Sequence, residues 1–183
     1  MRRVPAVLVL VLIAAACANK GSGGPGSGEP SGQTGPDPTR VEIYTAAFRS
    51  LAETERWFDP VLLDERICPD VAEVGKAEQA PCRERFTEAE QAAILTGLAD
   101  LPGVRFVDDA ERIQDRILED ELEPALDAVG LLTVGVIEGD DERVTVGGRS
   151  YCGGLCAHWM TLVLGNGPDG WTVTGTTGPV AIA

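Results

Sequence analysis

The first half of the chain carries apolar residues at the spacing of an α-helix. From Val41, apolar positions recur every three or four residues through Tyr44, Phe48 and Leu51. This pattern places one apolar stripe along a helix that is expected to end near Trp57.

The next segments are shorter and are separated by turn residues. Residues 58–71 contain two prolines and are expected to form turns. Thr87 and Glu90 have the spacing of a capping box, which predicts a helix that ends at the following Pro-Gly dipeptide. A short strand over VRFVDD should follow, and then a helix capped by Asp108 or Asp109.

The last third of the chain changes to the pattern of β-strands. Four runs that alternate or are continuously apolar are separated by turns rich in Gly, Asp and Asn, and they cover residues 131–139, 142–151, 157–165 and 171–183. Such runs predict an antiparallel meander of four strands. The expected fold class is α+β, with the N-terminal helices packed on one face of this C-terminal meander.

The N-terminus predicts export and attachment to a membrane. Residues 1–16 combine two arginines with a short apolar run, which is typical of a signal peptide. The run ends in IAAAC and resembles a bacterial lipoprotein signal, in which Cys17 would receive a diacylglycerol after cleavage. Residues 17–39 are rich in Gly, Ser and Pro and predict a flexible tether, followed by one globular domain over residues 40–183. Ordinary secretion is the alternative.

The charge of the chain limits its partners. The formal net charge is −14, which argues against nucleic acid because binding there depends on neutralising phosphates. It also argues against a domain that lies flat on an anionic membrane. The expected partners are the membrane, through the lipid anchor, and an unknown protein or small-molecule ligand. No cofactor is predicted. The preference for arginine over lysine suggests a high-GC genome such as that of an actinobacterium.

The five cysteines suggest disulfides in an oxidising compartment. If Cys17 carries lipid, four remain, and Cys152 and Cys156 bracket a short loop that they could close. Cys68 would then pair with Cys82, although a bond from either of these to the turn is the alternative. Two cysteines and the chain's one histidine could also bind a metal, but the compartment favours disulfides and we predict no metal site.

The stretch around the second cysteine pair holds the candidate binding residues. Pairing two strands about Gly154 places Cys152 directly opposite Cys156. Further along the same two strands, Ser150 lies opposite His158 and Arg149 opposite Trp159. These four side chains form the candidate binding set. A Ser–His pair also raises the possibility of nucleophilic catalysis, but no nucleophile elbow or oxyanion loop accompanies it, and no catalytic residue is assigned.

The same stretch carries a resemblance to a known group. YCGGLCAHW, followed by a strand, a turn and GW-x-V, resembles a group of uncharacterised bacterial envelope lipoproteins over Leu131 to Ala183. This chain has Ala157 where the group usually has glycine. The order of helices before a meander is also similar to the nuclear-transport-factor-2-like fold. Neither resemblance implies catalytic residues.

Two functional hypotheses therefore remain. The favoured one is a lipid-anchored protein on the extracytoplasmic side of the cell membrane that acts as a non-catalytic binding or assembly module. The alternative is an envelope hydrolase that uses His158. A pocket that holds His158 beside Ser150 and a carboxylate would favour the enzyme, and an open sheet edge would favour the module.

Overall fold

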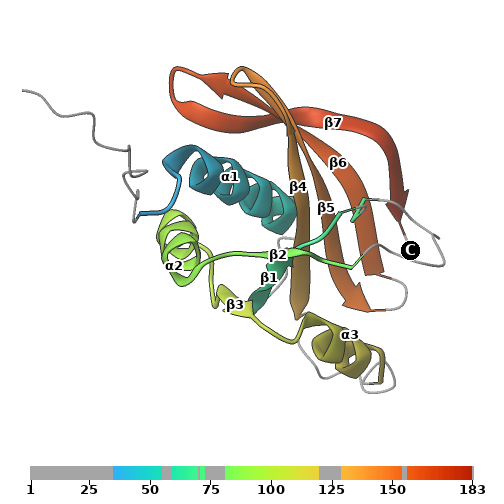
Figure 1. The fold of residues 1–183 in the computed structure, drawn as a ribbon. Coiled ribbons are helices and arrows are strands. Elements are labelled where there is room, and N and C mark those ends of the chain that lie inside the picture. The colour runs from blue at the N-terminus through green and yellow to red at the C-terminus, as the bar shows by residue number, and fades with distance from the viewer. Residues whose placement is uncertain are drawn as a thin grey trace, which may run out of the picture. The chain divides into compact units, whose positions relative to one another are not determined.

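The computed structural model of the chain contains one sheet of seven strands and three helices, shown in Figure 1. It describes residues 35–54, 59–69, 71–72, 81–119, 129–153 and 156–182. In chain order the elements are α1 (Pro38–Thr54), β1 (Val61–Ile67), β2 (Glu84–Arg85), α2 (Glu88–Gly97), β3 (Arg105–Val107), α3 (Ala110–Glu119), β4 (Gly130–Gly139), β5 (Arg143–Gly153), β6 (Cys156–Gly167) and β7 (Gly170–Ile182).

The sheet is mixed and larger than the sequence predicts. Its strand order is β2-β1-β4-β5-β6-β7, and β3 pairs with β1 beside this path. Strands β4 to β7 form the expected antiparallel meander. However, β1 runs parallel to both β3 and β4, so the expectation of a four-stranded antiparallel sheet is wrong.

Strand β1 lies in the segment that was expected to form turns. Val61, Leu62 and Leu63 are all at most 3% exposed. A strand covered on both faces reads as a continuous apolar run and lacks the alternation of a half-exposed strand. The prolines at positions 60 and 69 lie just outside the strand, so they delimit it and do not interrupt it.

Helix α1 fills the inner face of the sheet, which we define as the face that packs against this helix. In Figure 1 the strands β4 to β7 curve around α1. The predicted apolar stripe forms its buried side, with Tyr44, Phe48 and Leu51 each at most 1% exposed. The rings of Tyr44 and Phe48 pack against the ring of Phe86, with centroid distances of 4.8 and 6.0 Å respectively. Such aromatic contacts make this cluster a large part of the core.

Helix α3 packs on the opposite, outer face. There a second apolar cluster joins Ala110 of this helix to Leu62, Leu131 and Tyr151 of three neighbouring strands. The outer face therefore has its own small core. The expectation that all helices cover one face is wrong, because consecutive residues of the buried central strands point to opposite faces and both faces require an apolar cover.

Two of the predicted helix starts are confirmed. In α2, the Thr87 side chain accepts from the backbone N–H of Glu90, and the Glu90 carboxylate accepts from the backbone N–H of Thr87. In α3, the carboxylate of Asp109 accepts from the backbone N–H of Arg112 at 3.2 Å. Helix α1 begins at Pro38, two residues before the predicted domain start. Residues 1–34, including Cys17, lie outside the described residues.

The four remaining cysteines form two local pairs. Cys68 is bonded to Cys82 and Cys152 to Cys156, with Cα atoms 4.1 and 5.2 Å apart, which fits the disulfide prediction. The predicted direct opposition of Cys152 and Cys156 does not occur. The register shifts by one residue there, and Gly153 is the partner of Cys156 in the ladder.

The segment after Cys68 covers the outer face beside two glycines. Val71 is 4% exposed and lies over Gly135 and Gly147 of β4 and β5. A methyl group on Gly147 would lie 2.8 Å from Cγ1 of Val71, and one on Gly135 would lie 3.2 Å from it. The two glycines therefore leave the space that this valine occupies.

Candidate functional site

The four candidate binding residues are neighbours in the ladder but do not form one site. Arg149 pairs with Trp159 and Ser150 with His158, which confirms the predicted register. Adjacent residues of a strand point to opposite faces. The first pair therefore lies on the outer face and the second pair on the inner face.

The Ser150–His158 pair lies within the sheet. Ser150 is 1% exposed, and His158 is half-buried between Ser150 on β5 and Ile182 on β7. Neither residue lines either of the two cavities described below. The pair lies neither in a pocket with a carboxylate, which would favour the hydrolase, nor on an open sheet edge, which would favour the binding module. A substrate could reach the serine hydroxyl only if the sheet moved.

On the outer face, Arg149 belongs to a polar row that crosses the sheet. Thr133 of β4 is its ladder partner on one side and Trp159 of β6 on the other. The guanidinium donates from Nη2 to Oγ1 of Thr133 at 3.4 Å. Burial lowers the pKa of Arg149, and the nearby carboxylate of Asp64 opposes that shift.

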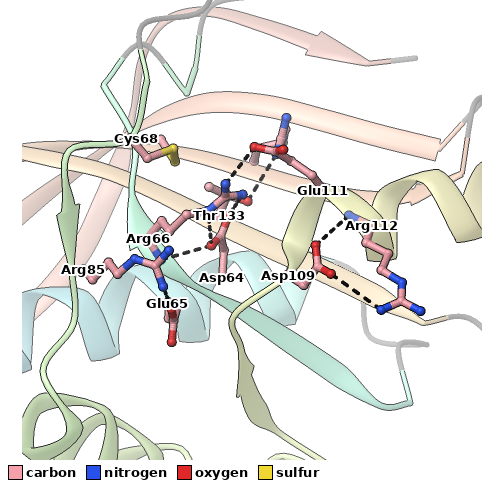
Figure 2. A network of polar contacts seen from close by, with 11 residues as sticks. Asp64, Glu65, Arg66, Cys68, Arg85, Asp109, Glu111, Arg112 and Thr133 are labelled. Carbon is pink, nitrogen blue, oxygen red and sulfur yellow. Dashed lines mark hydrogen bonds and ion pairs between the residues drawn. A yellow bond between two sulfur atoms is a disulfide. The ribbon is translucent and has the colours of Figure 1, made fainter.

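The row ends at a buried ion pair on β1, shown in Figure 2. The Asp64 side chain is 0% exposed and accepts from Nε and Nη2 of Arg66 at 3.0 and 3.1 Å. Arg66 also donates from Nη1 to Glu111 of α3 at 2.7 Å. The hydrogen bond to Asp64 raises the pKa of Arg66. This forked geometry is the strong form of an Arg–carboxylate contact.

The polar row is best explained as an internal support. Its carboxylate is fully enclosed, and one guanidinium joins β1 to helix α3. A buried charge is tolerated when it is paired in this way. The candidate residue Arg149 therefore contributes to holding the outer face together, since it is the second cation beside Asp64.

A groove on another part of the molecule is open to solvent. It has a volume of about 630 Å³ and runs along α1, between α2 and the start of β7. Figure 1 shows α1 between these two elements. Its lining residues are Val41, Glu42, Thr45, Ala46, Arg49, Ser50, Glu53, Ala93, Gly97, Asp169, Gly170, Trp171, Thr172 and Val173. This volume lies in the range of known small-ligand sites, roughly 300–1,000 Å³.

The wall between α1 and α2 is held firmly. A methyl group on Gly97 would lie 2.7 Å from Cγ2 of Thr45, so the glycine lets the two helices touch. Arg49 donates to the carbonyl of Gly97 at 2.6 Å and to both oxygens of Asp100 at 2.8 and 2.7 Å. These hydrogen bonds lower the pKa of Asp100 to about 2. Among the described residues, Arg49 is the only cation that lines the groove, and it is bound to the protein itself.

The remaining charged groups of the groove are acidic. Glu42 and Glu53 lie near the two ends of α1, and Asp169 lies in the turn before β7. Gly170 adopts a φ of +92°, and a methyl group there would lie 3.4 Å from Oε2 of Glu42. Trp171 provides an apolar wall and is itself 7% exposed. The groove therefore combines apolar walls with three carboxylates.

A second cavity lies on the outer face beside Val71. Its volume is about 160 Å³, and Gly135, Glu138, Thr145 and Gly147 contribute to its lining. This is well below the usual size of a ligand site. The larger groove is therefore the better candidate for binding.

The sequence interpretation missed the groove. Its strongest signal lies in α1, where Thr45, Ala46, Arg49 and Ser50 form a second stripe of small and polar residues opposite the apolar one. The Gly170–Trp171 step was noted as a closing motif, but its position beside this helix was not foreseen. The proximity of α2 to α1 depends on tertiary packing and has no local signal.

Comparison of the chain with protein-family models, with curated proteins and with solved structures found no match. The proposed fold and family resemblances therefore gain no support from a relative. Within the described residues, no helix is long and apolar enough to cross a membrane. The same residues contain no group of three His, Cys, Asp or Glu side chains placed to hold a metal ion.

Proposed function

We propose that this chain is a lipid-anchored protein of the bacterial cell envelope and that its folded part is a non-catalytic binding module. The groove along α1 carries this proposal. It is already formed without a ligand, its wall is fixed by the Arg49 contacts, and its size suits a small molecule or a short segment of a protein.

The anchoring part of the proposal rests on Cys17 and the residues around it. Three alanines precede this cysteine, and a segment rich in Gly, Ser and Pro follows it. In a bacterial host, Cys17→Ser should release the protein from the membrane fraction or leave it unprocessed. Wild-type membrane association after cleavage at the same site would contradict lipid attachment.

The binding part can be tested by blocking the groove. Full-length protein extracted in mild detergent would be analysed by native mass spectrometry for retained ligands. Ser50→Trp should abolish retention because its side chain would fill the groove, whereas Asp115→Trp, on the exposed side of α3, should leave retention unchanged. Equal retention by the two variants would show that the groove is not the binding site.

The alternative of a hydrolase is supported by one observation, the direct pairing of Ser150 with His158. The burial of the serine argues against it, because a nucleophile must reach its substrate. Ser150→Ala and His158→Gln should therefore leave ligand retention intact. An ester-hydrolysis activity of the wild type that both substitutions abolish would favour the enzyme.

A further inference from the structure

We infer that the groove along α1 receives an extended segment of a partner protein that carries positively charged side chains. This inference rests on the proposed binding function and specifies the chemistry of the partner. It depends on the charges that line the groove, on their spacing and on the shape of the floor between them.

The first argument is charge. Three carboxylates, Glu42, Glu53 and Asp169, line the groove, and the guanidinium of Arg49 is bound to Asp100. The Arg49 guanidinium also attracts Glu53, one helical turn further on, so the charge of Glu53 is partly compensated. Among the described lining residues, no cation other than Arg49 is available to Glu42 or Asp169. The chain as a whole has a net charge of −14, which adds a long-range attraction for a cationic partner.

The second argument is spacing. Glu42 and Glu53 are eleven positions apart on α1, which corresponds to roughly 16 Å along the helix axis. An extended peptide rises about 3.3 Å per residue, and every second side chain points to the same face, so two basic side chains four or six residues apart, roughly 13 or 20 Å, would reach these carboxylates. A helical ligand would need about eleven residues for the same distance, so the extended form spans the two carboxylates with far fewer residues.

The third argument is the floor of the groove. Between the two glutamates α1 presents Thr45, Ala46 and Ser50, which are half-buried and small. Trp171 and Val173 form the opposite wall. This channel has room for a backbone and short side chains, while longer basic side chains would extend to the carboxylates at its ends.

The inference can be tested with labelled peptides and full-length protein in detergent. The probe is Lys-Ala-Ser-Ala-Ser-Ala-Lys, which places its lysines six residues apart on the same side of the extended chain, and the controls are the same peptide with glutamates and one with the two lysines adjacent. Binding would be followed by fluorescence anisotropy at two salt concentrations. The first peptide should bind best, and its affinity should fall as salt rises.

Matched variants locate the contact. Exposed ion pairs are weak, so Glu42→Gln and Glu53→Gln should each reduce the affinity roughly threefold and the double variant about tenfold. Glu88→Gln, on the exposed start of α2 and outside the groove, should have no effect. Equal loss with Glu88→Gln, or equal binding of the glutamate peptide, would overturn the inference.

The Ser50→Trp variant separates this inference from the proposed function. If it abolishes retention of some natural ligand while the lysine peptide never binds, the groove is a binding site but the partner is not basic. If the lysine peptide binds equally well to Ser50→Trp, it contacts the acidic surface elsewhere and the inference is wrong. If Ser50→Trp alters neither peptide binding nor retention, both proposals fail.

Discussion

Removing the carboxylate of Asp64 is the sharpest test of the buried polar row. This side chain is 0% exposed and holds a forked hydrogen bond to Arg66, whose side chain is 18% exposed. Asp64→Ala would leave Arg66 and the half-buried Arg149 without this counter-charge. Breaking a buried ion pair by removing one partner costs about 3–5 kcal/mol, which lowers Tm by on the order of 10 °C in a domain of this size.

The same guanidinium offers an internal control. Arg66 also contacts Glu111 at 2.7 Å, but the Glu111 side chain is 81% exposed. An exposed pair contributes about 0–1 kcal/mol, so Glu111→Ala should lower the free energy of unfolding by less than about 1 kcal/mol. Each variant removes one carboxylate partner of Arg66, and the two partners differ chiefly in how deeply they are buried.

The assay is urea unfolding followed by tryptophan fluorescence and circular dichroism. Urea is uncharged and does not screen the ion pair, and an unchanged m-value would show that the folded state retains its compactness. Should Asp64→Ala not fold, Asp64→Asn retains the shape and one acceptor oxygen and should be destabilised to a smaller extent. Equal destabilisation by Asp64→Ala and Glu111→Ala would refute the argument from burial.

Three further predictions concern the core and the outer face. Burial raises the pKa of Tyr44 to about 12, so the stabilisation linked to its neutral hydroxyl is complete below pH 10 and is lost between pH 10 and 12. Melting curves at a series of pH values should therefore show a smaller loss of stability above pH 10 for Tyr44→Phe than for the wild type. Gly147→Ala should destabilise by about 1–3 kcal/mol through contact with Val71, and adding Val71→Ala should restore part of this in a double-mutant cycle. Replacing Cys68 and Cys82 together by serine should cost about 3 kcal/mol in urea unfolding, and a cost near zero would show that the bond does not restrict the unfolded chain.

Local patterns in the sequence were reliable where both partners lie close together in the chain. The pairing of Ser150 with His158 follows from a hairpin of a few residues, and its register was predicted correctly. The capping box of Thr87 and Glu90 is equally local. The bulge at Gly153 was missed because a one-residue shift inside a tight turn leaves no mark on the alternation of the strands.

The features that depend on distant segments were not predictable in this way. Strand β1 lies between partners that come later in the chain, and its apolar run of only three residues, followed by three charged ones, is too short to identify a buried strand by periodicity alone. The same holds for the ion pair of Asp64 and Arg66, which lie two residues apart on that strand. Their burial depends on α3 and on the neighbouring strands, and the groove likewise depends on how α1, α2 and β7 meet.

The parallel pairing of β1 with β4 also determines the order in which this chain can fold. Val61 pairs with Gly130, about 70 residues later, whereas each strand of the meander pairs with the next one along the chain. Contacts between distant residues form slowly because a long loop must close first. A chain that emerges N-terminus first can pair β1 with β3, but the other edge of β1 stays unpaired until β4 has appeared. Pulse-labelling hydrogen exchange during refolding should show the meander protected before β1, and the newly made protein should depend on chaperones during that interval.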